Sequence, residues 1–190
     1  MSLTFANKVT VGRILIVPFF ISTVLYYSPQ RDYLRFVALG FFLIAVVSDI
    51  VDGYIARTHK QKTTAGAILD PLADKFLLIS SFICLYQIGQ YLPVISFPMW
   101  LVVALISRDV SLLLGAMIIQ LNTGKLDIIP NRWGKMTAFF QIICVLGVLL
   151  QIKMSMMVWS VTLCVTIVSG IIYIREGIKV LNVSGHTVNR

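Results

Sequence analysis

The sequence predicts an all-α integral membrane protein with six transmembrane helices and a short N-terminal amphipathic segment. Of its 190 residues, 58% are hydrophobic and only 13% are charged, and the mean hydropathy is +0.89. A soluble domain carries about 25% charged residues, so lipid rather than water is the expected surrounding of most of this chain. Apolar stretches of roughly 17–25 residues recur along it, and each is long enough to span a hydrocarbon core of about 30 Å.

The six expected spans follow one another in a single domain over residues 1–190. After an amphipathic segment at residues 2–9, the spans lie near 10–27, 33–55, 68–90, 97–121, 134–152 and 155–176. Turn-forming residues such as Pro29, Pro98 and Pro130 separate them. The connections are too short for a soluble domain, so any chemistry is expected at the membrane face or inside the helix bundle.

Lysine and arginine are distributed unevenly over the connections. With an even number of spans, both termini lie on one side, and most of the basic residues fall there. The opposite connections hold only Arg31, Arg35 and Lys153. Basic residues concentrate on the cytoplasmic side, so both termini are expected in the cytoplasm, at a bacterial inner membrane. The net charge of +8 then orients the chain and attracts anionic lipids, and nucleic acid is not expected as a partner.

Two groups of small residues are interpreted as packing positions. Cys84, Cys144 and Cys164 lie inside apolar runs without ligand-like spacing, so they are expected to fill space rather than bind a metal or form disulfides. Ser111-x-x-x-Gly115 is a small-residue pair that can seat another helix, either within the bundle or from a second copy of the chain.

Four aspartates lie at fixed intervals on the second and third expected spans. Asp49 and Asp52 are three residues apart and Asp70 and Asp74 are four apart, so each pair shares one face of its helix. Carboxylates at membrane depth are costly, and four that converge repel one another unless cations neutralise them. Oxygen ligands favour hard divalent ions such as Mg²⁺ and Mn²⁺, so the pattern predicts a metal site.

The aspartates belong to a longer string of fixed spacing. It reads Asp49-x-x-Asp52-Gly53-x-x-Ala56-Arg57, then eight residues, then Gly66-x-x-x-Asp70-x-x-x-Asp74. This string resembles the signature of the CDP-alcohol phosphotransferases at every fixed position, and the chain length and six spans suit that family. The segment Asn7-x-x-Thr10-x-x-Arg13 is similar to the family's N-terminal element.

The resemblance implies an enzyme of phospholipid synthesis that transfers the phosphatidyl group from CDP-diacylglycerol to an alcohol and releases CMP. It implies two divalent cations, Mg²⁺ or Mn²⁺, held by Asp49, Asp52, Asp70 and Asp74, with Asp74 also the catalytic general base. The CDP-lipid-binding residues that it implies are Gly53, Ala56, Arg57, Thr63, Gly66, Asn7 and Thr10. Two metals can neutralise a pyrophosphate and stabilise a leaving nucleotide, which suits this chemistry. The resemblance also favours a homodimer.

The resemblance further implies glycerol 3-phosphate as the acceptor alcohol, and its dianionic phosphate needs positive charge, for which Arg108, Lys135 and Arg175 are the expected residues. Arg108 lies midway along a span, where an arginine needs a partner or a polar cavity. Asp109 is expected to be a poor partner for it, because adjacent residues of a helix do not face each other. Lys135 and Arg175 can equally be anchors that reach the lipid head groups.

Other functions stay open, and one is transfer to another acceptor used within the family, such as an inositol phosphate or serine. The pair Arg108-Asp109 is similar to one in family members that use phosphatidylglycerol as acceptor, so cardiolipin synthesis is the nearest alternative. A divalent-cation transporter is the non-enzymatic alternative, because carboxylates within spans also mark cation pathways. The basic residues Arg57, Lys60 and Lys62 beside the aspartates disfavour a cation entrance, and no internal repeat is visible.

Overall fold

The computed structural model describes residues 5–58, 64–123, 132–153 and 155–187, with side chains described for 12–51, 75–115, 117, 134–153, 156–173 and 175. Within these residues the chain forms six α-helices, two short 3-10 helices and no strand, so the expected all-α fold is confirmed. The helices group into two compact units. Unit 1 is Met1–Phe97 with Val145–Lys153, and unit 2 is Pro98–Cys144 with Met154–Arg190.

The helices follow the expected spans closely at most of their ends. Unit 1 contains α1 (Phe5–Leu25), η1 (Pro29–Arg31), α2 (Tyr33–Thr58), α3 (Thr64–Gln87) and η2 (Gly89–Tyr91). Unit 2 contains α4 (Met99–Thr123) and α6 (Ser155–Thr187), whereas α5 (Arg132–Leu149) begins in unit 2 and ends in unit 1. The amphipathic segment at 2–9 stays a prediction, because α1 runs from Phe5 into the first expected span without a break.

The largest difference from the expected boundaries is at the end of α6. The expected span ends at residue 176, but the helix continues to Thr187. Hydropathy marks where the apolar run ends, and a helix continues through polar residues with good helix propensity, such as Lys179.

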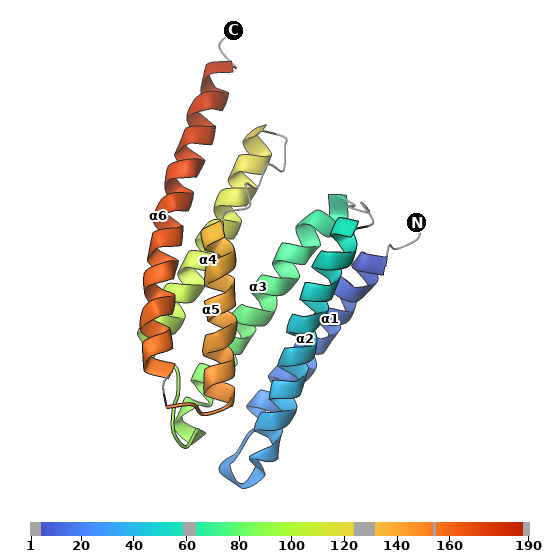
Figure 1. The fold of residues 1–190 in the computed structure, drawn as a ribbon, viewed down its shortest axis with the longest axis vertical. Coiled ribbons are helices and arrows are strands. Elements are labelled where there is room, and N and C mark those ends of the chain that lie inside the picture. The colour runs from blue at the N-terminus through green and yellow to red at the C-terminus, as the bar shows by residue number, and fades with distance from the viewer. Residues whose placement is uncertain (1–4, 59–63, 124–131, 154, 188–190) are drawn as a thin grey trace. The chain divides into compact units, whose positions relative to one another are not determined.

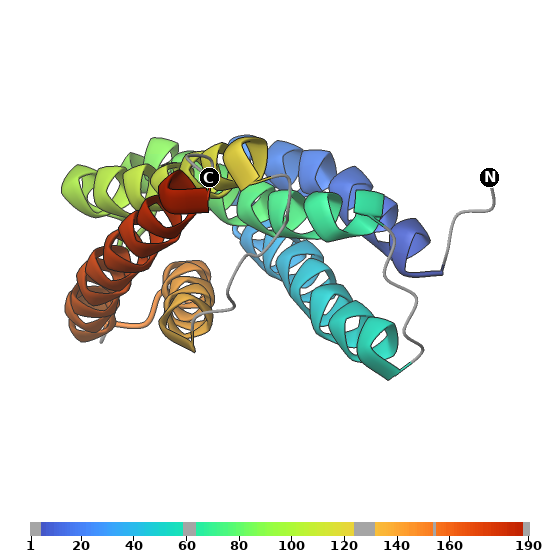
Figure 2. The ribbon, with the colours of Figure 1, turned by 90° about the horizontal axis from the view of Figure 1, so that it is seen from above.

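The core of unit 1 is built around α1. This helix packs against both α2 and α3, and it runs antiparallel to α2 and parallel to α3 (Figure 1). Seen from above, α1 and α3 lie alongside each other and α2 is inclined to them (Figure 2). Buried residues recur at helical spacing on the facing surfaces: Val17, Phe20 and Val24 on α1 and Ala38, Phe42 and Ala45 on α2. The rings of Phe20 and Phe42 lie 5.9 Å apart.

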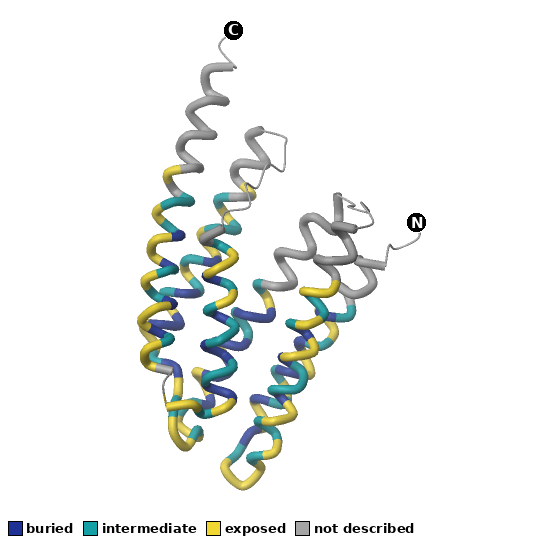
Figure 3. The backbone as a smooth tube through the Cα atoms, in the orientation of Figure 1, coloured by how far each residue is buried: buried dark blue, intermediate teal, exposed yellow. Residues whose placement is uncertain are grey.

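The outward faces of these helices are apolar as well. Phe19 on α1 and Leu43, Ile44 and Val47 on α2 are exposed, and Figure 3 shows exposed and buried positions alternating along both helices. A helix that is apolar on every side suits a lipid environment. Two stretches among the described residues are long and apolar enough to cross a membrane, Tyr33–Val51 and Met156–Tyr173. Six crossings therefore stay a prediction.

In unit 2, α4 and α6 pack closely at Gly115. A Cβ atom at this position would lie 3.0 Å from Cε1 of Tyr173, which is tighter than ordinary van der Waals contact. The Tyr173 hydroxyl donates a hydrogen bond to the carbonyl oxygen of Leu112, at 3.1 Å. Gly115 thus seats a residue of α6 within the chain, whereas Ser111 of the same pair is exposed.

The cysteines meet the packing expectation only in part. Cys84 and Cys144 are buried and Cys164 is exposed, and all three are free thiols. The expectation that Cys164 fills the core is wrong, because its position on α6 points away from the packed faces of that helix. Cys144 lies 3.1 Å from the Thr162 hydroxyl, a contact between α5 and α6 in unit 2.

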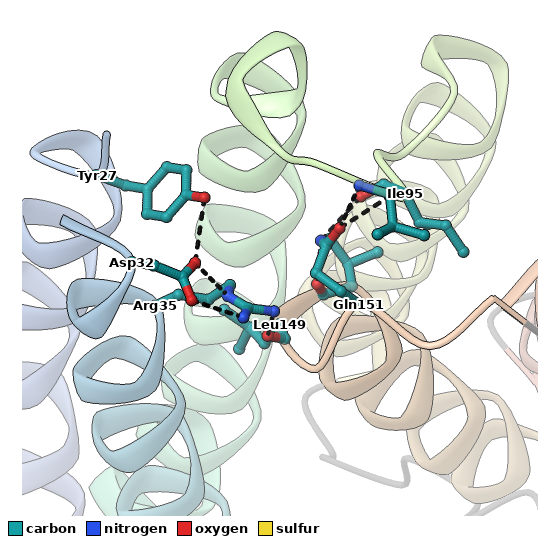
Figure 4. Close-up of polar contacts among 8 residues, drawn as sticks. Tyr27, Asp32, Arg35, Ile95, Leu149 and Gln151 are labelled. Carbon is teal, nitrogen blue, oxygen red and sulfur yellow. Dashed lines mark hydrogen bonds and ion pairs between the residues drawn. The ribbon is translucent and has the colours of Figure 1, made fainter. Parts of the chain in front are cut away.

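A polar cluster ties the start of α2 to the end of α5 in unit 1 (Figure 4). Arg35 donates two hydrogen bonds to Asp32, of 3.0 and 2.9 Å, and a third to the carbonyl oxygen of Leu149, of 3.0 Å. The hydrogen bonds from Arg35 hold the pKa of Asp32 below its ordinary value. The Tyr27 hydroxyl donates a longer bond, of 3.4 Å, to the same carboxylate.

Gln151 follows the C-terminal end of α5 and holds the loop between η2 and α4. Its φ of 56° is left-handed, and the amides of Gln151 and Ile152 bond back to Val148 and Gly147, which forms a Schellman-type helix end. Its side chain accepts hydrogen bonds from the amides of Val94 and Ile95, at 2.9 and 3.0 Å. It also donates to the carbonyl oxygens of Ile95 and Val148, at 3.0 and 2.7 Å (Figure 4).

Gln151→Gly is expected to lower the stability of unit 1. Glycine adopts the left-handed conformation without the strain that glutamine bears there, so relief of strain offsets part of the loss of the side-chain hydrogen bonds, and a net loss of about 1–2 kcal/mol is expected. Thermal unfolding in detergent measures this loss. Gln30→Ala, at an exposed position in η1, is the control and should leave the melting temperature unchanged. A Gln151→Gly protein as stable as the wild type would show that the side chain does not hold the loop.

Candidate functional site

The structure places the aspartate motif on two helix ends of unit 1. Asp49 and Asp52 lie on the C-terminal part of α2, and Asp70 and Asp74 lie on the N-terminal part of α3. Because both segments are helical, each pair lies on one face, as the spacing predicted. The end of α2 and the beginnings of α1 and α3 lie at the same end of unit 1 (Figure 1).

Asp49 is the one member of the four whose side chain the structure describes. Among the described side chains, no three Asp, Glu, His or Cys residues form a group that could hold a metal ion. Asp52, Asp70 and Asp74 lie outside that set. The metal site therefore stays a prediction.

The expected nucleotide-binding residues share this end of unit 1. Gly53, Ala56 and Arg57 continue α2, and Gly66 lies in the first turn of α3. Their side-chain surroundings, and Thr63 altogether, lie outside the described residues. Asn7 and Thr10 lie on the first turns of α1, and their side chains are outside the described set as well.

Arg13 joins α1 to the aspartate motif. Its Nη1 lies 2.6 Å from Oδ1 of Asp49, and the Arg13 side chain is 1% exposed whereas that of Asp49 is 44% exposed. A buried guanidinium needs a charged partner to offset its lost hydration, and this ion pair supplies one. The pair fixes one oxygen of Asp49 and leaves the carboxylate accessible at its other side.

Sequence reasoning used Arg13 for topology and for a motif match, but it did not predict this contact. The usable signal was the position of Arg13 inside an apolar run, where an arginine needs a partner. Arg13, Val17, Phe20 and Val24 share the buried face of α1, so the same periodicity that gives the core also directs Arg13 inward.

Arg108 lies in a buried polar network of unit 2. Its Nη1 donates to Oδ1 of Asp109, at 2.8 Å, and its Nη2 donates to the hydroxyl of Ser169 on α6. Oδ2 of Asp109 accepts a hydrogen bond of 3.0 Å from Nε2 of Gln141 on α5. Asp109, Gln141 and Ser169 are all buried.

The expectation that Asp109 is a poor partner for Arg108 is wrong. Adjacent side chains leave a helix in different directions, but the arginine side chain is long enough to turn back to the neighbouring carboxylate. Burial favours this arrangement, because each charge needs compensation in a medium of low dielectric constant. Sequence reasoning missed Ser169, since a serine on an apolar helix carries no signal of its partner.

Lys135 and Arg175, the other two expected phosphate-binding residues, are exposed in unit 2. Neither forms an ion pair or a side-chain hydrogen bond with any residue whose side chain is described. Their exposure fits both a phosphate-binding role and an anchoring role at the lipid head groups.

Comparison with known proteins identifies the class to which this fold and motif belong. The family model described as CDP-alcohol phosphatidyltransferase matches residues 3–168, which run from the N-terminus into α6. The chain is thus one of the helical membrane transferases of phospholipid synthesis. It belongs to the CDP-alcohol phosphatidyltransferase family, and the resemblance in the aspartate motif is confirmed.

Three relatives show the range of similarity. A probable phosphatidylglycerophosphate synthase of Mycobacterium tuberculosis is 28% identical over 180 residues, covering 92% of this chain and 81% of the relative. A CDP-diacylglycerol–glycerol-3-phosphate 3-phosphatidyltransferase of Bacillus subtilis is 32% identical over 156 residues, 76% of each chain. A CMP-forming cardiolipin synthase of Oryza sativa subsp. japonica is 32% identical over 114 residues, 58% of this chain and 34% of the relative.

Proposed function

We propose that the protein transfers the phosphatidyl group of CDP-diacylglycerol to glycerol 3-phosphate, giving phosphatidylglycerophosphate and CMP. The observation that carries this proposal is the complete aspartate–glycine motif on the adjoining ends of α2 and α3. The names of the bacterial relatives that cover most of this chain support glycerol 3-phosphate as the acceptor.

Asp49, Asp52, Asp70 and Asp74 would hold two divalent cations, Mg²⁺ or Mn²⁺. The described residues fit such a group, because Asp49 offers a half-exposed carboxylate of which Arg13 binds one oxygen. An all-carboxylate set suits hard divalent ions. When bound, the cations neutralise the pyrophosphate and stabilise the charge on the departing CMP.

The residues of the chain bind the substrates and move one proton. Asp74 takes the proton from the acceptor hydroxyl while the oxygen of this hydroxyl forms a bond to the phosphorus of the phosphatidyl group. The bond from this phosphorus to the oxygen of CMP breaks, and its electron pair leaves with CMP. Arg57 and Thr63 hold the CDP group, with Asn7 and Thr10 beside it, and Gly53, Ala56 and Gly66 leave room for it.

Arg108, Lys135 and Arg175 bind the phosphate of the acceptor. Arg108 supports this role most strongly, because its guanidinium is held by Asp109 and Ser169 inside unit 2 and its buried Nε has no hydrogen-bond partner among the described residues. Arginine binds phosphate oxygens through directed N–H groups, so a fixed guanidinium is a suitable receptor.

We further propose that six helices cross a bacterial inner membrane, with both termini and the aspartates at the cytoplasmic face, and that the enzyme is a homodimer. The apolar outward faces of α1 and α2 support a lipid surrounding. The excess of lysine and arginine on the side of the termini supports the orientation.

Cardiolipin synthesis remains the second candidate, supported by the Oryza relative and by the Arg108-Asp109 pair. A panel of acceptors separates the two. Purified protein with CDP-diacylglycerol and Mg²⁺ or Mn²⁺ should release CMP with glycerol 3-phosphate and much less with phosphatidylglycerol. Preference for phosphatidylglycerol would overturn the proposed acceptor, and no CMP release with any alcohol would favour a cation carrier.

A further inference from the structure

The buried network around Arg108 links three helices of unit 2 through side chains alone. Gln141 on α5 donates to Asp109 on α4, Arg108 on α4 donates to Asp109, and Arg108 also donates to Ser169 on α6. The Arg108 side chain is 8% exposed and the Asp109 side chain is 2% exposed. Hydrogen bonds of this kind between packed helices restrict the orientation of each side chain in the network.

The hydrogen-bond partners of Asp109 and Arg108 show how the guanidinium is held. Gln141 donates to Oδ2 of Asp109 and Arg108 donates to Oδ1, so the two bonds reach different oxygens of the carboxylate. Nη2 of Arg108 donates to Ser169. A guanidinium has five N–H groups, and the bonds to Asp109 and Ser169 use two of them, so other N–H groups of Arg108 remain for a ligand.

We propose that Ser169, Asp109 and Gln141 are positioning residues that hold the Arg108 guanidinium in place for a phosphate-bearing acceptor. This inference rests on the proposed function, since it assumes that Arg108 binds the acceptor. An unrestrained arginine side chain loses rotamer entropy when it binds a ligand. Restraint by Ser169 removes part of that loss before the acceptor arrives, so Ser169 strengthens acceptor binding without contacting the acceptor.

The alternative is that the network only stabilises the packing of α4, α5 and α6. The two roles differ in what Ser169→Ala changes. A packing role predicts that Ser169→Ala lowers the stability of the protein and changes the KM values of both substrates alike. A positioning role predicts that it weakens binding of the acceptor alone. It also predicts that Ser169 has no influence once Arg108 is replaced.

The test is a double-mutant cycle on the full-length enzyme with CDP-diacylglycerol, Mg²⁺ and glycerol 3-phosphate. Ser169→Ala should raise the KM for glycerol 3-phosphate about 3- to 30-fold and leave the KM for CDP-diacylglycerol unchanged, because Ser169 acts on the acceptor only through Arg108 and only part of the lost hydrogen bond is felt in binding. Arg108→Gln should raise it further, and adding Ser169→Ala to Arg108→Gln should have no additional effect. Ser169→Thr keeps the hydroxyl and should restore most of the acceptor affinity.

Thr166→Val is the matched control. Thr166 is a buried hydroxyl residue of the same helix, and its hydroxyl donates to the carbonyl oxygen of Thr162 within α6. Its replacement should leave the KM for glycerol 3-phosphate unchanged. Three results would overturn the positioning role. Thr166→Val could raise the KM for glycerol 3-phosphate as much as Ser169→Ala does, or Ser169→Ala could raise both KM values equally. The third is that the effects of Ser169→Ala and Arg108→Gln on this KM are independent.

The outcomes for the two proposals are separable. If the wild type uses phosphatidylglycerol instead of glycerol 3-phosphate, the proposed acceptor is wrong, and the same cycle with phosphatidylglycerol decides the positioning role. If Arg108→Gln leaves the KM for the acceptor unchanged, Arg108 does not bind it, and the positioning role is overturned as well. An effect of Arg108→Gln without one of Ser169→Ala overturns the positioning role alone.

Discussion

Asp52→Asn is expected to lower CMP release by roughly three orders of magnitude while the protein still folds. Asparagine has nearly the size of aspartate but no charge, so the change removes one anionic metal ligand without changing the helix. Asp52 follows Asp49 by three residues on α2, so the two positions share one face of the helix. Loss of one carboxylate should weaken the binding of the proposed cations.

Two measurements check this result. CMP release from CDP-diacylglycerol reports activity, and electron paramagnetic resonance of added Mn²⁺ reports metal binding without turnover. EDTA should abolish activity in the wild type, and Mg²⁺ or Mn²⁺ should restore it. Nearly normal CMP release by Asp52→Asn would contradict the assignment of Asp52 as a metal ligand.

Asp32→Asn is the matched control for this experiment. Asp32 has the same side-chain exposure as Asp49, and it also pairs with an arginine. It precedes α2, in the polar cluster with Tyr27 and Arg35 at the opposite end of that helix from the motif. Its replacement should change stability slightly and leave Mn²⁺ binding as in the wild type.

Much of the fold could be predicted from the sequence, because the length and spacing of apolar runs determine helices directly. The start of α2 and of α6 agree with the expected spans, and most other ends differ by a few residues. The end of α6 differed most, since the signal used was hydropathy and the helix continues past its apolar part. Hydropathy also gave no information on how the helices group into units.

The candidate site was predicted from spacing, and its side-chain contacts were not. Regular intervals placed Asp49 and Asp52 on one face of a helix, which required only the period of the α-helix. The contact between Arg13 and Asp49 depends on how α1 packs against α2, and no local pattern encodes that packing. In the same way, Ser169 is separated from Arg108 by 61 positions and becomes its partner only through the packing of α4 and α6.

The expectation for Asp109 was wrong because it considered only the directions in which adjacent side chains leave a helix. The rule that adjacent residues diverge holds for short side chains, but it neglects the length of arginine and the penalty for leaving Asp109 buried without a partner. Burial of Asp109 was not visible in the sequence, because its place within an apolar run fits a cavity as well as a packed interior.

Arg108→Gln is expected to raise the KM for glycerol 3-phosphate by about 10- to 150-fold for each charge-assisted hydrogen bond that it removes. The acceptor carries a dianionic phosphate, which needs directed cationic donors where water is largely excluded. Glutamine keeps an amide that can donate to Asp109, so this buried carboxylate does not lose all of its partners. The KM for CDP-diacylglycerol should stay close to that of the wild type, because the CDP group is bound by other residues.

Arg108→Lys is expected to recover only part of the acceptor affinity. Lysine restores the charge, but a single ammonium group cannot bind Asp109, Ser169 and a phosphate in the directions that the guanidinium serves. Steady-state kinetics with each substrate varied in turn measure both KM values, and thermal unfolding checks that each variant is folded. Lys153→Gln, at an exposed position outside the helices, is the control for loss of a positive charge. If Arg108→Gln and Arg108→Lys raised both KM values alike, the residue would serve the structure of unit 2 and not the recognition of the acceptor.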